Sequence, residues 1–396
     1  MAKTLTVSDL DIANKRVLVR VDFNVPQDKQ GNITDDSRIV ASLPTIKHIV
    51  KNKGKAILIS HLGRPKGVSP EFTLAPCAKR LSELLQQPVQ FAQDCIGATV
   101  QAQIQAMKPG DCLLLENVRF YPAEEKPELD PTFAEKLANL ADLYVNDAFG
   151  TAHRAHSSTT TVAKFFPGKA AAGYLLEKEI NFLGDVLTNP KRPFIAIVGG
   201  AKISTKIGVL KALCNKVDTL LIGGAMAYTF FKAEGIPVGD SLVENEMLDL
   251  AKEILQSGCK ILLPRDVVAA KAFHADAAYK TFGIPEGIPD GYQGMDIGEK
   301  TLREWSDVLS KAKTILWNGP VGVFEMKPFA KGTHGIARAI STVAGAITIV
   351  GGGDSVAAIQ EAGLADKFTH VSTGGGASLE YVEFGTLPGI KALSTS

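Results

Sequence analysis

The fold of this chain is decided by residues 193–210, which read PFIAIVGGAKISTKIGVL. The run FIAIV is short and continuously apolar, and it is followed by Gly199-Gly200 and then by a helical pattern. A strand without polar alternation is typical of a parallel sheet that is buried on both faces. The stretch therefore predicts a strand, a glycine turn and a helix, which is the repeating unit of α/β folds.

Similar apolar runs recur along the chain and alternate with helical patterns. In the first half they are RVLVRVDF, KAILIS, CLLLENV and LYVND, and in the second half PFIAIVGG, DTLLIGG, KILLP, KTILWNG, AITIVGG and FTHVSTGG. One intervening segment, LAPCAKRLSELLQQ, repeats Leu81, Leu84 and Leu85 at helical spacing. We expect an α/β protein with two doubly wound, Rossmann-like domains, each built on a parallel sheet.

The boundary between the domains is expected at a helix near the middle of the chain. A helical pattern runs from Tyr174 to about Leu187, and Asn-Pro with a basic pair follows it. We therefore predict a connecting helix and hinge over residues 173–188, with domains at 1–172 and 189–376.

Composition narrows the class of protein. The chain has 396 residues, 45% hydrophobic and 21% charged, with a net charge of +1. Such a balance is typical of a globular protein and gives no large basic field for nucleic acid. The five cysteines include no C-x-x-C pair, which favours a reducing compartment and buried thiols. The N-terminal residues carry no secretory pattern and no apolar run reaches membrane-spanning length, so we expect a soluble cytoplasmic protein.

Polar side chains follow the strands predicted in the first half. Ligands of open parallel sheets bind where the strands end and the loops enter the next helix. Arginine pairs well with phosphate and carboxylate, so arginines recurring at successive strand ends predict a pocket for a small anion. An H-x-x-H spacing superficially suggests zinc, but no third ligand is near, so we do not expect zinc. The residues at these strand ends are Asp22, Asn24, Arg38, His61, Arg64, Arg119, His153, Arg154 and His156.

Glycines follow the strands predicted in the second half. They stand at 199–200, 223–224, 319, 351–353 and 374–376, where backbone N–H groups can approach phosphate oxygens. Lys202 and Lys206 are spaced i and i+4, so we expect both on one face of the following helix. Asp354 follows the triple glycine and suits one magnesium ligand. This half predicts a nucleotide-phosphate site, although no P-loop or G-x-G-x-x-G motif follows a predicted strand.

The two halves together favour phosphoryl transfer in a cleft between the domains. That reaction needs positioning and charge neutralisation more than covalent chemistry from the protein. If the acceptor is already an oxyanion, no general base is required.

A series of motifs resembles the phosphoglycerate kinase family in order, from about Arg16 to Gly389. They are RVDFNVP, SHLGRP, LLLENVRF, NDAFGTAHRAHSS, VGGAKISTKI, LIGGAMAYTF, WNGPVGVFE, GGGDS and HVSTGGGASLE. The resemblance implies a phosphotransferase with a carboxyl group as acceptor. It would move a phosphoryl group reversibly from 1,3-bisphosphoglycerate to Mg-ADP, giving 3-phosphoglycerate and ATP, in glycolysis, gluconeogenesis or carbon fixation.

The resemblance also implies roles for individual residues. Catalytic roles fall to Arg38, Lys202 and Lys206. Substrate binding falls to Asp22, Phe23, Asn24, Arg38, His61, Leu62, Gly63, Arg64, Arg119 and Arg154. Nucleotide binding falls to Lys206, Gly294, Glu325, Gly352, Gly353, Asp354 and Ser355, with Asp354 also at the magnesium ion.

Further implications concern the whole chain. The family implies hinge closure, a monomer, Mg²⁺ as the cofactor with no organic cofactor, and a tail, residues 377–396, that packs back on the first domain. The main alternative is a catalytically silent member that acts as a binding or scaffold protein. A nicotinamide dehydrogenase would carry the G-x-G-x-x-G turn, and a secreted solute-binding protein would carry an export signal.

Overall fold

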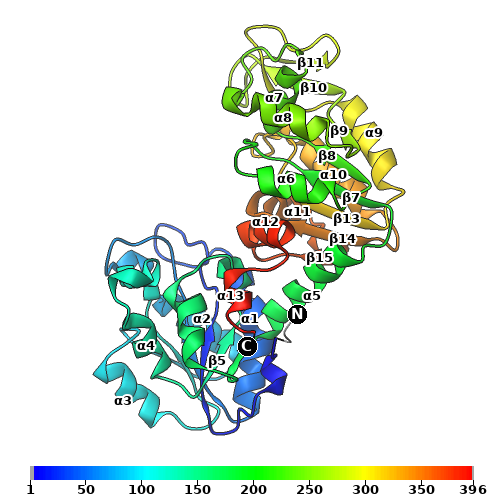
Figure 1. The fold of residues 1–396 in the computed structure, drawn as a ribbon. Coiled ribbons are helices and arrows are strands. Elements are labelled where there is room, and N and C mark those ends of the chain that lie inside the picture. The colour runs from blue at the N-terminus through cyan, green and yellow to red at the C-terminus, as the bar shows by residue number, and fades with distance from the viewer. Residues whose placement is uncertain (1–3, 395–396) are drawn as a thin grey trace. The chain divides into compact units, whose positions relative to one another are not determined.

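The computed structural model describes residues 4–394, which form two compact units. The first unit comprises residues up to 181 together with the C-terminal segment from 386, and the second comprises residues 182–385. Each unit contains one six-stranded parallel sheet, as the pattern of apolar runs predicts (Figure 1). No helix in the described part of the chain is long and apolar enough to cross a membrane.

The sheet of the first unit has the strand order β3-β4-β2-β1-β5-β6. All its neighbouring strands pair in parallel. Its strands are β1 (Arg16–Arg20), β2 (Lys55–Ile59), β3 (Val89–Phe91), β4 (Cys112–Leu114), β5 (Leu143–Asn146) and β6 (Ala170–Ala172). Its helices are α1 (Ser37–Lys51), α2 (Ala75–Leu85), α3 (Ala98–Ala106) and α4 (Phe133–Ala138).

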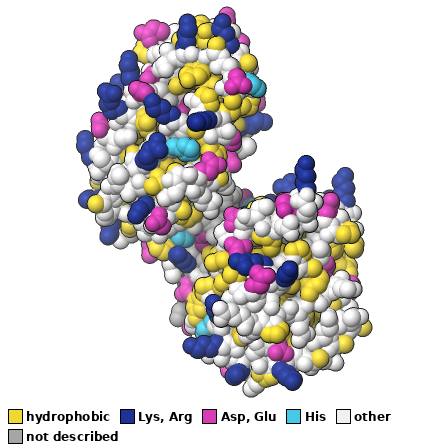
Figure 2. Space-filling view, turned by 180° about the vertical axis from the view of Figure 1, so that it is seen from behind, with side chains coloured by type: hydrophobic (Ala, Val, Ile, Leu, Met, Phe, Trp, Pro, Cys, Tyr) yellow, Lys and Arg dark blue, Asp and Glu magenta, His cyan; other side chains and the backbone are white. Residues whose placement is uncertain are grey.

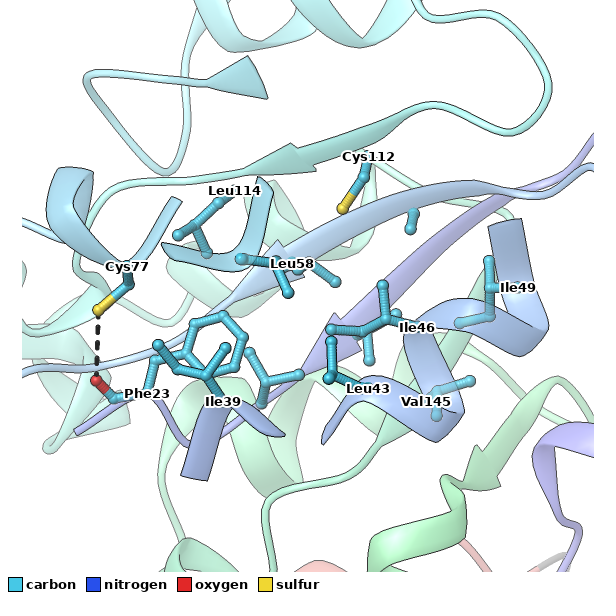
Figure 3. Packing of buried hydrophobic residues seen from close by; sticks show 14 of the residues in the cluster. Phe23, Ile39, Leu43, Ile46, Ile49, Leu58, Cys77, Cys112, Leu114 and Val145 are labelled. Atoms are coloured by element: carbon cyan, nitrogen blue, oxygen red, sulfur yellow. Dashed lines mark hydrogen bonds between the residues drawn. The ribbon is translucent and has the colours of Figure 1, made fainter. Parts of the chain in front are cut away.

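Helix α1 packs its apolar stripe against this sheet. Ile39, Leu43 and Ile46 recur at helical spacing, and Figure 3 shows them beside Leu58 of β2 and Val145 of β5. These side chains are buried or nearly so. Burying such a side chain stabilises a fold by about 1.5–3 kcal/mol, so this face holds α1, and Arg38 at its start, in place.

The sheet of the second unit has the order β15-β14-β13-β7-β8-β9. Its strands are β7 (Phe194–Val198), β8 (Thr219–Ile222), β9 (Ile261–Leu262), β13 (Thr314–Asn318), β14 (Ile347–Gly351) and β15 (His370–Val371). Its helices are α6 (Ile207–Cys214), α7 (Met226–Ala233), α8 (Leu248–Leu255), α9 (Glu299–Leu309), α10 (Lys331–Ser341), α11 (Gly353–Glu361) and α12 (Gly375–Phe384).

A second, antiparallel sheet in this unit was not predicted from the sequence. It has the order β11-β10-β12, with β10 at Asp266–Ala270, β11 at Tyr279–Gly283 and β12 at Gln293–Ile297. Its edge strand β11 is largely exposed, and the register of β10 on β12 shifts between Val268 and Ala269. Because these strands carry no long apolar run, the pattern that identifies parallel strands does not reveal them.

Helix α5 (Tyr174–Thr188) connects the units, close to the predicted span of 173–188. The C-terminal boundary differs from the expected one. Residues 377–385 belong to the second unit, because α12 packs on α6 and buries Tyr381 and Val382. The chain rejoins the first unit from residue 386, where α13 (Pro388–Lys391) follows and the Gly389 N–H donates to the Ala152 carbonyl at 2.8 Å. Thr4 and Ser394 form a β-bridge, so both ends of the described chain lie side by side.

The surface charges agree with the small net charge. Figure 2 shows basic and acidic side chains spread together over the face that it draws. The formal net charge is +1.

Asp147 anchors the start of the connecting helix. It follows β5 and is buried, and its Oδ1 accepts the Leu175 N–H at 2.9 Å and the Leu176 N–H at 3.3 Å. Backbone N–H groups in the first turn of a helix have no partner within the helix, so Asp147 satisfies two of them. The helix dipole also stabilises negative charge at this end. Burial nevertheless raises the pKa of Asp147 to about 7.

We predict that Asp147 makes the first unit less stable as the pH rises. The carboxyl group is protonated in the folded protein up to about pH 7 but ionises near pH 4 when unfolded, so the free energy of unfolding falls across that window. Asp147→Asn keeps an acceptor and removes the titration. Relative to the variant, the wild type should lose about 2–3 kcal/mol between about pH 5 and about pH 8 in urea unfolding followed by circular dichroism. Asp142→Asn is the control of opposite sign, because Arg16 lowers the pKa of Asp142. A wild-type–variant difference that does not change with pH would contradict the prediction.

Candidate active site

The polar residues predicted at the first-unit strand ends meet through direct hydrogen bonds. Arg38 Nη1 donates to Asp22 Oδ2 at 2.9 Å, which joins the start of α1 to the segment after β1. The Gly63 N–H donates to Asn24 Oδ1 at 2.8 Å, which joins that segment to the loop after β2. Phe23 and Leu62 are buried beneath these contacts. The loops of β1 and β2 are therefore held as one surface.

Two further arginines join this surface from other strands. Arg119, in the 3-10 turn after β4, donates from Nη1 to the Gly63 carbonyl at 2.7 Å. Glu125 Oε1 lies 3.2 Å from Arg119 Nε and 3.9 Å from Arg154 Nη1, so one carboxylate faces both guanidinium groups. Arg64 is exposed in the same loop as Gly63. The predicted anion-binding residues thus come together at this edge of the sheet.

The positive charge of these arginines lowers the pKa values of the neighbouring histidines. Burial holds the pKa of His61 well below its usual value, and Arg20, Arg119, Arg38 and Arg154 lower it further. Burial with repulsion from Arg119, Arg154 and Arg20 lowers the pKa of His156 to about 3. Both imidazoles are therefore neutral at neutral pH, and the positive charge resides on arginines that cannot lose it. Such a site attracts a compact anion.

Arg20 is a buried charged residue next to His61 that the sequence analysis did not identify. It ends β1, is fully buried, and donates from Nε to Ser158 Oγ at 2.8 Å. Ser158 in turn donates its N–H to Glu124 Oε2 at 2.9 Å and its hydroxyl to Glu124 Oε1 at 2.5 Å. The signal was present in RVLVRVDF, because an arginine inside a strand buried on both faces requires a buried partner.

Arg20 also determines the tautomer of His61. Its Nη2 lies 3.2 Å from His61 Nδ1. A guanidinium group only donates, so Nδ1 must be the accepting nitrogen and the proton must be on Nε2. His61 therefore presents Nε2 as a hydrogen-bond donor.

The second unit has a pocket of about 300 Å³ at the glycine-rich strand ends. Gly319 and Gly352 have φ values of +92° and +91°, which favour glycine. A Cβ at Gly199 would lie 2.1 Å from the Pro320 carbonyl oxygen, so any side chain there would displace the backbone. The pocket is lined by Gly200, Ala201, Lys206, Asn318, Gly319, Pro320, Gly352, Gly353, Asp354, Gly375, Gly376 and Leu379.

Lys206 is the cation of this pocket. Its Nζ donates to the Gly199 carbonyl at 2.6 Å and to Asn318 Oδ1 at 3.0 Å. Desolvation lowers the pKa of Lys206 to about 8, although Asp354 acts in the opposite direction. The ammonium group is thus held among neutral acceptors, and a phosphate would be a better partner for it.

The expected helical placement of Lys202 and Lys206 was wrong. Helix α6 begins at Ile207, and Lys206 is its non-helical N-cap residue with φ −132°. Lys202 lies in the preceding turn and is exposed. The non-helical segment after β7 extends to Lys206, further than predicted, so an i, i+4 relation does not place these two side chains.

The N-terminus of α11 forms another wall of the pocket. Gly352 is the N-cap, Gly353 and Asp354 are exposed, and a Cβ at Gly353 would have no atom within 4 Å. Helix N-termini favour anions through their free N–H groups and dipole. Ser355 is buried, and its Oγ accepts the Gly319 N–H at 2.7 Å. This hydroxyl therefore fixes the position of Gly319 beneath the pocket surface.

Gly294 and Glu325 lie outside the lining of this pocket, in two segments that a backbone hydrogen bond joins. Gly294 is in β12, and a Cβ there would lie 2.0 Å from Tyr228 Oη. The Val323 N–H donates to the Met295 carbonyl at 2.8 Å, which ties the loop of the exposed Glu325 to β12. Lys202 does not line the pocket either.

Comparisons with known proteins identify the family of this chain. Residues 7–384 match the family model described as phosphoglycerate kinase. The chain is 55% identical to the phosphoglycerate kinase of Chlorobaculum tepidum, over 98% of this chain and 99% of that protein. It is also 55% identical to that of Moorella thermoacetica, over 100% of both. The solved structure of phosphoglycerate kinase from Coxiella burnetii superposes with a TM-score of 0.87 at 41% identity, covering 99% of each chain. The chain belongs to the phosphoglycerate kinase family of phosphotransferases.

Proposed function

We propose that the first unit binds 3-phosphoglycerate or 1,3-bisphosphoglycerate and the second binds Mg-ADP or Mg-ATP, with reversible phosphoryl transfer between them. The observation that carries this proposal is the difference between the two sets of strand ends. One set concentrates guanidinium groups around neutral imidazoles, and the other forms a glycine-lined pocket around Lys206. The first suits a small acid phosphate and the second suits a nucleotide phosphate chain.

In the first unit, the proposed substrate contacts are those of the basic surface. Arg119, Arg154 and the exposed Arg64 supply paired donors for phosphate oxygens, and His61 supplies Nε2–H. Asp22 and Asn24 are proposed to bind the substrate hydroxyl or carboxylate region while they hold Arg38 and Gly63. The rigid contacts below them, through Phe23 and Leu62, reduce the entropy lost on binding.

In the second unit, Lys206 with the N–H groups of Gly352 and Gly353 is proposed to bind the nucleotide phosphates. Asp354 is an exposed carboxylate beside this pocket, and one carboxylate combined with phosphate oxygens is a donor set that suits Mg²⁺. When bound, the ion would neutralise charge on the phosphates. Gly294 and Glu325 are proposed for the adenine and ribose, because their segments are joined next to each other.

Transfer itself is proposed to depend on positive charge around the moving group. Lys202 is exposed and Arg38 is partly exposed, so both side chains are accessible to a ligand. We propose that they stabilise the negative charge that develops on the transferring phosphoryl group. The acceptor is already an oxyanion, so no protein group needs to remove a proton. Hinge closure through α5 is proposed to exclude water during transfer.

A silent binding protein is the alternative, and the presence of Arg38, Lys202, Lys206 and Asp354 argues against it. We also propose a cytoplasmic monomer. The five free cysteines support a reducing compartment.

Turnover should depend on the positive charges of Arg38 and Lys202. With 3-phosphoglycerate and Mg-ATP, a glyceraldehyde-3-phosphate dehydrogenase coupled assay should show NADH loss. Arg38→Ala and Lys202→Ala should each lower kcat by about 10²–10³-fold, because each removes charge stabilisation from the transition state. Arg16→Ala and Lys311→Ala are matched controls with little expected effect, since both lie at the amino-terminal side of their strands. Folded protein that binds both ligands without turnover would favour the silent alternative.

Nucleotide binding should depend on pH through the ammonium group of Lys206. Lys206 is charged below about pH 8 in the free protein, and phosphate should raise its pKa. Binding of Mg-ADP at about pH 8–9 should therefore take up a proton, and affinity should fall by up to about tenfold per pH unit above this range. Calorimetry in buffers of different ionisation enthalpy measures the uptake. Lys206→Met should bind Mg-ADP weakly and without proton uptake, whereas Lys311→Met should behave as the wild type. Equal uptake by Lys206→Met and the wild type would exclude Lys206 as the titrating group.

Arg20 should affect both the protonation of His61 and the binding of 3-phosphoglycerate. In ¹⁵N NMR spectra, His61 should show a protonated Nε2 and should stay neutral at pH values where ordinary histidines protonate. Arg20→Gln removes one repulsive charge and should raise the pKa of His61 and weaken binding of 3-phosphoglycerate by about tenfold or more. Arg16→Gln, at the other end of β1, should change neither property. An unchanged His61 titration in Arg20→Gln would show that Arg20 does not control the imidazole.

A further inference from the structure

Two cysteines of the second unit, Cys214 and Cys259, are joined by a side-chain hydrogen bond, and neither lines the glycine-rich pocket. Cys214 is the last residue of α6, and Cys259 lies between α8 and β9. Lys211 Nζ and Glu253 Oε1, 2.8 Å apart, join α6 to α8 beside them. The residue after Cys259 is held in register, since the Leu220 N–H donates to the Lys260 carbonyl at 2.9 Å.

An open pocket gives access to Cys214. It has a volume of about 400 Å³, and its lining includes Cys214, Lys211, Glu253, Gln256 and Ser257. Cys214 and Cys259 are both partly exposed, whereas Cys77, Cys95 and Cys112 are buried. A small polar molecule can therefore reach Cys214 but not the other three sulfur atoms.

The pair also differs from the buried cysteines in its chemistry. The hydrogen bond from the Cys259 thiol lowers the pKa of Cys214 to about 7, and Ser257 contributes while burial opposes the shift. Cys259 has its pKa raised by the same contact. Burial raises the pKa of Cys77 and of Cys112 to about 12. The thiolate is the reactive form, and Cys214 is also the cysteine that lines the open pocket, so its accessibility and its lowered pKa both favour it as the nucleophile.

We propose that Cys214 and Cys259 form a modification site that reacts with low-molecular-weight disulfides and closes to an intramolecular disulfide. In the first step the Cys214 thiolate attacks one sulfur of the small disulfide, forms a mixed disulfide and releases one thiolate. In the second step Cys259 attacks Cys214 Sγ, and its proton goes to the second departing thiolate. Two protein thiols are oxidised and one small disulfide is reduced to two thiols.

The local backbone permits this closure. A disulfide needs its sulfur atoms at about 2.05 Å, closer than hydrogen-bonded thiols. Residues 256–260 belong to no helix or strand, and Gly258 has a φ of +81°. Once Cys214 is in the mixed disulfide its negative charge is gone, so the contact that raised the pKa of Cys259 no longer opposes ionisation of that thiol. The product would tie the C-terminal end of α6, which begins next to Lys206, to the segment before β9.

The test uses the full chain and oxidised glutathione at neutral pH. After incubation, free thiols are blocked under denaturing conditions and the protein is mapped by mass spectrometry. We expect two of the five thiols to disappear, a cross-linked peptide pair that contains Cys214 and Cys259, and full reversal by dithiothreitol. Cys259→Ser should trap one glutathionyl group on Cys214, because the second step is removed.

Matched variants make the result decisive. Cys214→Ser should keep all its thiols free, and Cys112→Ser, at a buried cysteine, should still lose the same two as the wild type. Five free thiols in oxidised wild type would overturn the proposal. So would disulfide-linked dimers on a non-reducing gel, or a Cys259→Ser protein with no glutathionyl group. The wild-type map decides the question even if a serine variant fails to fold.

Discussion

Burial of the parallel strands on both faces is the constraint on which the rest of this structure depends. The strands β1, β2, β5, β7, β8 and β13 are almost wholly inaccessible, so polar chemistry is confined to their ends. Parallel order places all carboxyl ends at one edge of each sheet. Segments distant in sequence, such as those of Gly63 and Arg119, therefore reach the same edge, where hydrogen bonds fix their positions. The hydrophobic pattern, rather than the polar residues, builds the site.

Arg20 is an exception to this rule, because it is a charged residue buried within strand β1. A guanidinium group placed inside a buried strand has a large desolvation cost, which is offset only by close partners. Ser158 and Glu124 supply them on one side and His61 on the other. Glu124 is itself fully buried, and desolvation raises its pKa even though Arg20 acts against this. The network joins Arg20 to His61, so a buried guanidinium group adds to the desolvation that keeps this imidazole neutral.

The parts of the molecule that sequence could predict are those governed by a single local pattern. The parallel strands, the connecting helix at Tyr174 and the glycine turns follow from apolar runs and residue type, and the motifs identify the family. The antiparallel sheet was missed because the exposed β11 carries no such pattern. The helical placement of Lys202 was wrong because α6 begins only at Ile207, and the residue types between Gly200 and Lys206 do not mark where the turn ends. The assignment of residues 377–385 failed because packing of α12 on α6 depends on contacts between distant segments.

The two candidate half-sites share an electrostatic principle despite their different composition. Lys206 is held by Gly199 and Asn318, two neutral acceptors that do not compensate for its desolvation, as its lowered pKa shows. In the first unit, burial and the nearby guanidinium groups lower the pKa values of His61 and His156, so both histidines stay neutral. In both places the folded protein maintains positive charge under conditions that disfavour it. An anion relieves that repulsion or desolvation as it binds, and it gains more when its own negative charge is greater. Because the groups are already fixed by the fold, little reorganisation is needed as charge develops on a bound phosphate, and this preorganisation is what a phosphotransferase requires from its protein.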